Sequence, residues 1–356
     1  MNHRDFLPFV TKPGRYIGQE YNVPARSFSE APLHCALVFP DLYEIGMSHQ
    51  GIQILYHILN KLEHVSAERC FCPDIDAEKI LKIKRMPLVS LESGRPLSEF
   101  DFVGITLPHE LCYTNILTIL DRSEIPFFSA DRDDTHPIVI GGGACALNPE
   151  PVADFFDAIL LGDGEEAVVD IARLPLTSRD NNQSRRQRIE QLSNIDGVYL
   201  PSHYSPVYDE DGRMVEMKHH GTDPPRVMKR VLANLDTLGH LHQPIVPNSR
   251  IVHDRLGIEV ARGCTRGCRF CQAGITYRPV RERSVDQIID LAEHGISNSG
   301  FEELALLSLS TGDYSCLPEL LPKLMSRFSH EYVSVALPSM RVGTLTQDLM
   351  DEIKRV

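Results

Sequence analysis

The sequence has no tryptophan, only nine cysteines and no long apolar run among its 356 residues. So few cysteines exclude a disulfide-stapled scaffold, and no stretch approaches the roughly 18 apolar residues of a membrane span. The N-terminus lacks the pattern of a signal peptide, because its apolar stretch from Phe6 to Val10 is short and contains Pro8. We therefore expect a cytoplasmic protein with reduced thiols that are free to bind metal, and no membrane partner.

Positive charge is also in short supply. The 36 basic residues against 49 acidic ones give a net charge of −13, which argues against nucleic acid as a partner of the whole surface. The 42% of hydrophobic residues is enough for more than one buried core. A chain of this length is typical of two to three domains.

Short apolar runs alternate with helical patterns, which predicts an α/β protein. After an irregular arm over 1–30, residues 31–171 are expected to form a doubly wound parallel sheet, with strands at 34–39, 102–107, 137–140 and 158–161. Residues 172–250 are interpreted as a connector with a small β element, in which 177–191 is a polar linker or helix and 207–215 a hairpin. The alternation returns over 251–356, with strands at 257–261, 303–309 and 332–337 and helices at 285–294, 317–328 and from about 346.

The most specific motif follows the strand at 257–261. It reads Arg262-Gly-Cys264-Thr-Arg-Gly-Cys268-Arg-Phe-Cys271, with the spacing C-x3-C-x2-C. Three thiolates on one tight loop can bind three irons of a 4Fe-4S cube, which leaves the fourth iron open to a substrate or cofactor. Gly263 and Gly267 allow the loop to wrap closely.

Two other kinds of metal site are alternatives for these cysteines. Structural zinc usually takes four ligands, and Cys316, after the next strand, is the one candidate for a fourth. A ferredoxin cluster takes four cysteines at C-x2-C spacing, which this loop does not supply. The spacing favours the open cluster over both.

Cys264, Cys268 and Cys271, with Phe270 before the last cysteine, resemble the signature of the radical S-adenosylmethionine (SAM) enzymes. The resemblance implies that the free iron chelates the amino and carboxylate groups of SAM. The reduced cluster, which needs an external electron donor, would cleave SAM to methionine and a 5′-deoxyadenosyl radical. Phe270 would lie near the adenine. The expected SAM-binding residues further along are Thr311, Gly312 and Asp313, which replace the family's Gly-Gly-Glu-like stretch, and Ser339 and Arg341.

The same resemblance implies that 251–356 forms the first part of a partial (β/α) TIM barrel. The family's barrel has about six β/α units, whereas 257–356 supplies three strands, whose open edge would expose unpaired backbone groups. We therefore expect a truncated chain, a split gene product or half of a two-chain enzyme. In the last case a second chain that carries the rest of the barrel is a partner.

A second motif, Asp41-Leu-Tyr43-Glu-Ile-Gly46, resembles the D-x-H-x-x-G loop of cobalamin-binding domains. Thr106 stands where that family has a serine-containing strand end, and Gly141, Gly142 and Gly143 resemble its Gly-Gly step. Together with the domain order, and with Gly162-Asp-Gly-Glu-Glu166, this resembles the cobalamin-binding radical SAM group. It implies a cobalamin site without a histidine ligand from the loop, because Tyr43 takes that position. The alternative is that the glycines serve packing and Asp41 a turn.

Several functions stay open at this point. The first is a radical SAM enzyme, or its N-terminal part, with or without coupling to cobalamin. A variant is a methylthiotransferase-like modification of RNA or protein, although the N-terminal cysteines (Cys35, Cys70, Cys72, Cys112 and Cys145) are scattered. The others are a non-catalytic iron-sulfur or cobalamin module and a zinc-stabilised binding protein. The sequence assigns neither a catalytic acid or base nor a substrate.

Overall fold

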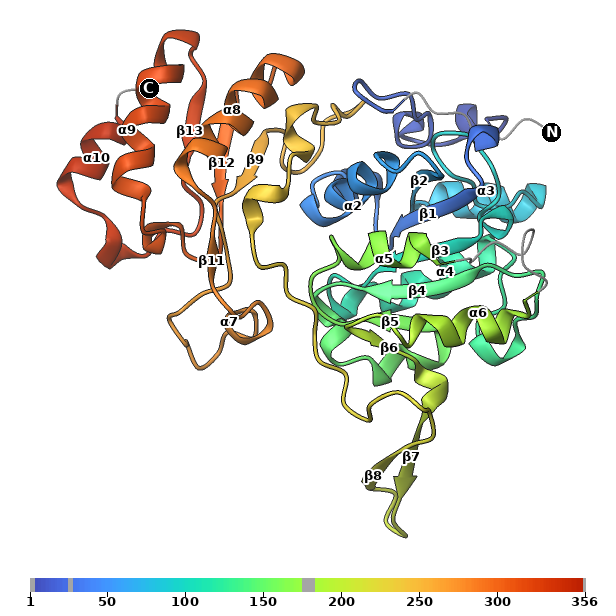
Figure 1. Cartoon of the computed structure of the whole chain (residues 1–356). Helices are drawn as coiled ribbons and strands as arrows, with labels where there is room; N and C mark the ends of the chain where they lie inside the picture. The colour runs from blue at the N-terminus through green and yellow to red at the C-terminus, as the bar shows by residue number, and fades with distance from the viewer. Residues whose placement is uncertain (1–3, 25–27, 175–182, 355–356) are drawn as a thin grey trace. The chain divides into compact units, whose positions relative to one another are not determined.

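The computed structural model describes residues 4–24, 28–174 and 183–354, and the chain divides into two compact units (Figure 1). The first consists of Met1–Gln19 and Pro24–Val231, and the second of Glu20–Val23 and Leu232–Val356. The division after Val231 falls inside the stretch 172–250 that was interpreted as a connector. Most of that stretch therefore belongs to the first unit.

A six-stranded sheet in the order β2-β1-β3-β4-β5-β6 forms the centre of the first unit. Its strands are β1 (Leu33–Phe39), β2 (Val65–Phe71), β3 (Phe102–Thr106), β4 (Ile138–Gly142), β5 (Ala158–Leu160) and β6 (Val198–Tyr199). Every residue of β1 is buried, as expected for a central strand of a parallel sheet. The predicted parallel pattern holds from β1 to β5, whereas β6 runs antiparallel at the edge.

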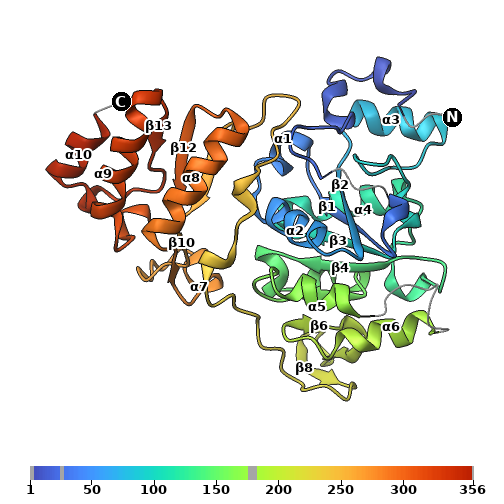
Figure 2. The same ribbon diagram turned by 45° about the horizontal axis from the view of Figure 1, so that its top comes forward.

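Helices cover the sheet, as the predicted α/β class requires. They are α1 (Tyr43–Gly46), α2 (Gln50–Asn60), α3 (Ile75–Lys84), α4 (Tyr113–Arg122), α5 (Ala167–Arg173) and α6 (Arg185–Leu192). Figure 2 shows α2 beside α5, and these two helices contact each other as α3 contacts α4. Doubly wound folds bind ligands at the carboxyl ends of their parallel strands.

The sequence analysis missed β2, because Glu68 and Arg69 interrupt its apolar pattern. Both side chains are buried, and both form hydrogen bonds with residues of the loop at 92–93. The Arg69 Nε donates to Glu92 Oε1 at 2.7 Å, and the Ser93 hydroxyl donates to Glu68 Oε2 at 2.6 Å. Buried charges with partners of this kind are tolerated in a strand.

The connector contains the predicted hairpin, formed by β7 (Tyr204–Tyr208) and the antiparallel β8 (Met214–His219). Gly212 has a φ of +76° in its turn, a conformation that favours glycine. Of the polar stretch 177–191, residues 177–182 lie outside the described residues, and α6 occupies most of the remainder. A capping box between Ser184 and Gln187 begins that helix.

The second unit is built on three parallel strands in the order β13-β12-β9. These are β9 (Leu256–Glu259), β12 (Glu303–Leu307) and β13 (Ser334–Ala336), and its longer helices are α8 (Val285–Ser299), α9 (Leu317–Phe328) and α10 (Gln347–Ile353). Apolar residues of the strands and the three helices form one core. Gly300, at a φ of +74°, ends α8. No helix within the described ranges is long and apolar enough to cross a membrane.

Candidate functional site

The cysteine motif lies on a loop whose two ends are joined. The loop leaves β10 (Ala261–Arg262), contains α7 (Ala273–Thr276) and returns through β11 (Arg281–Glu282), which pairs with β10 antiparallel. Next to this strand pair, the Arg262 guanidinium donates two hydrogen bonds to the Glu259 carboxylate, at 2.8 and 2.9 Å. A Cβ on Gly263, which has a φ of +92°, would lie 2.6 Å from the carbonyl oxygen of Tyr277. Glycine there lets the two arms of the loop meet.

The three thiols of the motif are half-buried and form no disulfide. The backbone N–H of Cys271 donates to the carbonyl of Cys268 at 3.1 Å, and the N–H of Arg266 points to Cys264 Sγ at 3.5 Å. Between them Gly267 turns the chain at a φ of +63°, and a Cβ there would meet nothing within 4 Å. The three half-buried cysteines therefore lie on a turn that is open at Gly267.

Charged side chains from two neighbouring strand ends approach the loop. Arg266 forms an ion pair with Asp313, whose Oδ2 accepts from the arginine Nε at 2.6 Å. The hydrogen bonds from Arg266 and Ser310 lower the pKa of Asp313 to about 2. Arg341 Nη1 lies 3.9 Å from Cys268 Sγ. The structure thus brings Asp313 and Arg341, from the segments after β12 and β13, to the cysteine loop.

The other expected SAM-binding residues have different surroundings. Phe270 is 92% exposed on the loop, so one ring face is available to a ligand. Thr311 is fully buried, and its hydroxyl contacts the carbonyls of Leu306 and Pro338. Thr311 therefore ties two loops together. Gly312 lies where a Cβ would stand 2.0 Å from Thr344 Oγ1.

The backbone of Ser339 adopts a left-handed conformation, with a φ of +64°. This rare conformation places a sharp bend just before Arg341. The expected role of Ser339 toward SAM stays a prediction.

The donors on the loop fit an iron-sulfur cluster. Thiolates from cysteine are the ligands of such clusters. The three cysteines on this loop are half-exposed and form no disulfide. Among the described residues, no other group lies within 4 Å of a Cβ placed on Gly267, so the turn between the first two cysteines is open on that side. Cys264, Cys268 and Cys271 would hold three irons.

Two family models match the chain. "Radical SAM proteins, N-terminal" matches residues 51–201, and "Radical SAM superfamily" matches residues 258–356, which include the cysteine loop. The chain belongs to the radical SAM superfamily. The family signature identified in the sequence is thereby confirmed, and with it the 4Fe-4S cluster and SAM as cofactors of this class.

Relatives of this radical SAM protein are longer than it is. An uncharacterized protein of Methanocaldococcus jannaschii is 26% identical over 322 residues, which cover 90% of this chain and 58% of that protein. The solved structure of the radical SAM methyltransferase TsrM from Kitasatospora setae, with cobalamin and a [4Fe-4S] cluster bound, superposes with a TM-score of 0.52 at 14% identity. That match covers 91% of this chain and 59% of TsrM, and it shows a shared fold.

Two of the three residues expected at a cobalamin loop, Tyr43 and Gly46, are buried in the radical SAM protein's own core. Tyr43 is 1% exposed and packs edge-on against Phe71. A Cβ on Gly46 would lie 2.2 Å from the same ring. Asp41 Oδ1 accepts the N–H of Leu42 at 2.7 Å, which is a turn contact. Tyr43 thus offers no group to a ligand, and packing alone accounts for Gly46.

The glycines after β4 are also explained by close packing. A Cβ on Gly141 would lie 3.1 Å from Phe156, and one on Gly143, at a φ of +128°, would lie 2.9 Å from the Leu107 carbonyl. Gly142 pairs with Thr106 across β3 and β4. A Cβ on Gly142 would meet its nearest neighbours at 3.7 Å, which is ordinary contact. Gly142 is therefore the glycine of this group that the local packing does not require.

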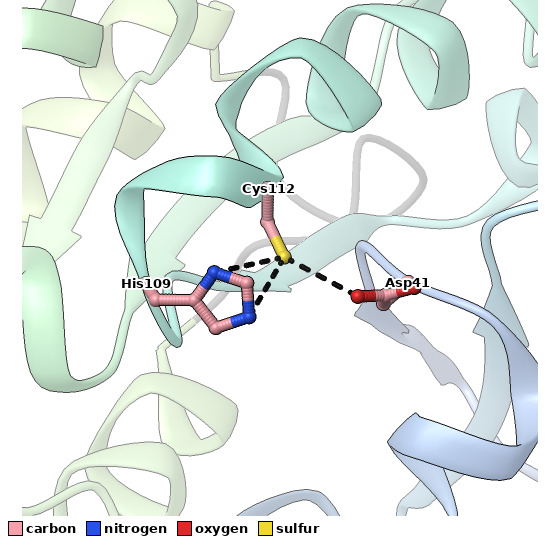
Figure 3. A group of neighbouring side chains, drawn as sticks. All are labelled: Asp41, His109 and Cys112. Atoms are coloured by element: carbon pink, nitrogen blue, oxygen red, sulfur yellow. Dashed lines mark hydrogen bonds between the residues drawn. The ribbon is translucent and has the colours of Figure 1, made fainter.

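Sequence reasoning missed a group that the sheet brings together. Asp41 follows β1, while His109 and Cys112 follow β3, which pairs with β1. Figure 3 shows Cys112 Sγ between the His109 ring and the Asp41 carboxylate. Cys72, after β2, is adjacent, because its N–H donates to the Asp41 carbonyl at 3.0 Å. The available signal was that each residue closely follows a strand of one parallel sheet.

The thiols at this edge are protonated at neutral pH. Burial, reinforced by the charge of Asp41, raises the pKa of Cys112 to about 12, and Cys145 adds to the shift. Burial, with Asp41 among the further causes, likewise raises the pKa of Cys72 to about 12. A reactive cysteine needs a lowered pKa, so neither thiol is an activated nucleophile.

Proposed function

We propose that this radical SAM protein binds a 4Fe-4S cluster through Cys264, Cys268 and Cys271 and uses it to cleave SAM reductively. The observation that carries the proposal is the closed loop with three thiols and open space at its turn. When bound, the cluster supplies one electron to the sulfonium of SAM, so that the C5′–S bond breaks to give methionine and a 5′-deoxyadenosyl radical. The electron comes from an external donor, which is a partner by chemical necessity.

The chain's own side chains have complementary tasks around the loop. Arg266 and Arg341 place positive charge beside thiolates that carry negative charge when they ligate iron. Asp313 offers a carboxylate to the ammonium group of SAM, and Arg266 holds it ionised and oriented at 2.6 Å. Phe270 offers an exposed ring to the adenine. Binding of SAM then requires Asp313 to be shared between Arg266 and the ligand.

Anaerobic reconstitution with iron and sulfide, followed by reduction and EPR spectroscopy, tests the proposal. We expect a 4Fe-4S signal that changes on addition of SAM, together with 5′-deoxyadenosine detected by mass spectrometry. A signal indifferent to SAM, without product, would show a metal-binding module instead of an enzyme. Stoichiometric zinc without a cluster would overturn the proposal for this chain.

Cobalamin is the second cofactor that we propose, bound by the first unit. The support is the shared fold with TsrM, whose structure contains cobalamin, and a parallel sheet with polar groups at its carboxyl edge. Since Tyr43 is buried, the cobalt would receive no ligand from that position.

Retention of hydroxocobalamin on gel filtration, measured by its visible spectrum, tests this second proposal. We expect one equivalent to be retained. Gly142→Ala adds a methyl group at the last residue of β4, where the fold accommodates it at 3.7 Å, and we expect it to weaken retention about tenfold, equivalent to about 1.4 kcal/mol. Absence of retention by the unmodified chain would contradict the proposal.

The second unit has an edge that another strand can fill. β13 pairs with β12 on one side, and among the described residues no strand pairs with its other side. Unpaired edges invite strand addition. We propose that full activity requires further strands along β13, supplied by a longer form of the chain or by a second chain.

A further inference from the structure

Three donors of different chemistry converge at the carboxyl edge of the first unit's sheet. Cys112 Sγ lies 3.8 Å from Asp41 Oδ2 and 3.5 Å from His109 Nε2. Their donor atoms all lie within 4.8 Å of one another. A zinc ion with bonds of about 2.3 Å to sulfur and about 2.0–2.1 Å to nitrogen or oxygen, at tetrahedral angles, separates its ligands by about 3.6 Å. The two separations measured from Cys112 Sγ, 3.5 and 3.8 Å, are close to that value.

We propose that Asp41, His109 and Cys112 bind one divalent transition-metal ion of the zinc class. A thiolate, an imidazole and a carboxylate together are borderline-soft donors that suit Zn²⁺ and not Mg²⁺ or Ca²⁺. Three protein ligands leave a fourth position for water or a substrate atom. As the ion binds, the Cys112 thiol loses its proton to water and a metal–sulfur bond forms. The three ligands belong to the first unit and include none of the cysteines of the loop.

The surroundings hold two of the ligands in place. Asp41 Oδ1 accepts the Leu42 N–H, which leaves Oδ2 directed at Cys112. Asn115 Nδ2 donates to the Pro40 carbonyl at 2.9 Å, so the start of α4 is tied to the turn that carries Asp41. Hydrogen bonds of this kind orient metal ligands.

The geometry disfavours a simple thiol–imidazole pair. Cys112 Sγ is 3.6 Å from His109 Nδ1 and 3.5 Å from Nε2. The sulfur is thus almost equally far from the two ring nitrogens (Figure 3), whereas a hydrogen bond would direct it at one of them. His109 is accessible to solvent, and rotation of its ring directs one nitrogen at an ion beside the sulfur. A hydrogen bond between Cys112 and His109 alone would not explain the Asp41 carboxylate, whose Oδ2 lies 3.8 Å from the same sulfur.

The test uses the full chain with Cys264, Cys268 and Cys271 replaced by serine, which removes the competing thiols of the loop. The metal-free protein is titrated with Co²⁺ and then Zn²⁺. We expect one equivalent of Co²⁺ to give a sulfur-to-cobalt charge-transfer band that Zn²⁺ abolishes. The groups His203–His219–Asp223 and His242–Asp290–His294 contain no thiol and cannot produce that band.

Added to this background, Cys112→Ser is expected to remove the band, and His109→Gln to keep it while weakening affinity by more than about 100-fold. Cys70→Ser, which removes another buried thiol of the same sheet, is the matched control and should retain the band. His109→Gln keeps the test valid if Cys112→Ser fails to fold. No band in the background protein, a band that survives Cys112→Ser in the folded protein, or binding of iron with sulfide in place of the single ion would overturn the proposal.

Discussion

Replacing Cys268 with alanine is expected to abolish the 4Fe-4S EPR signal and to lower SAM-dependent formation of 5′-deoxyadenosine by at least about 100-fold, equivalent to about 2.7 kcal/mol in the barrier. Cys268 is the middle thiol of the loop, and Cys271 reaches back to its carbonyl. Two remaining thiolates cannot hold three irons. The measurement is iron and sulfide content, EPR and product analysis on the same reconstituted sample.

Cys316→Ser is the matched control for this prediction. Cys316 is half-buried in the same unit and lies at the start of α9, outside the motif. We expect its cluster and product to match those of the unmodified chain. Loss of the cluster in Cys316→Ser would mean four protein thiolates and a closed cluster, which is incompatible with SAM binding at a free iron.

Asp157→Asn is expected to destabilise the first unit by about 3–5 kcal/mol, because it leaves two buried guanidinium groups without a countercharge. Asp157 Oδ2 accepts from Arg132 at 3.2 Å, from Arg185 at 2.6 Å and from the N–H of Val139 at 2.7 Å. The three side chains are almost fully buried. Urea unfolding followed by circular dichroism, with hydrogen exchange of β4 amides to locate the change, measures the effect.

Glu99→Gln provides the comparison within the same unit. Its exposed ion pair with Arg95, four residues earlier, contributes only about 0.3–0.5 kcal/mol in general. We expect the loss of free energy of unfolding to be severalfold larger for Asp157→Asn than for Glu99→Gln. Equal effects would show that the buried network contributes no more than a surface pair.

The sequence allowed prediction of features whose residues are neighbours in the chain. The cysteine motif is local, and β1 and α8 follow from uninterrupted apolar periodicity. β2 was missed because the partners of Arg69 and Glu68 lie more than 20 residues away in sequence. A local pattern cannot show that a charged residue in a strand has a distant partner.

The candidate site at the sheet edge shows the same limit. Asp41 and Cys112 are 71 residues apart, and they meet only because β3 pairs with β1. Conversely, Gly46 and Gly141 resembled ligand-binding glycines in the sequence, while Phe71 and Phe156 fill the space beside them. Which residue fills the space next to a glycine is decided by tertiary packing, so glycine spacing alone could not separate the two interpretations.

The strand pair at the ends of the cysteine loop lets the chain fold before a metal is bound. Because β10 and β11 hold the loop ends and the apolar core of the unit contains none of the three motif cysteines, the fold does not depend on iron. We therefore expect loss of the proposed cluster to oxygen to leave the chain folded and to be reversible with fresh iron, sulfide and a reductant.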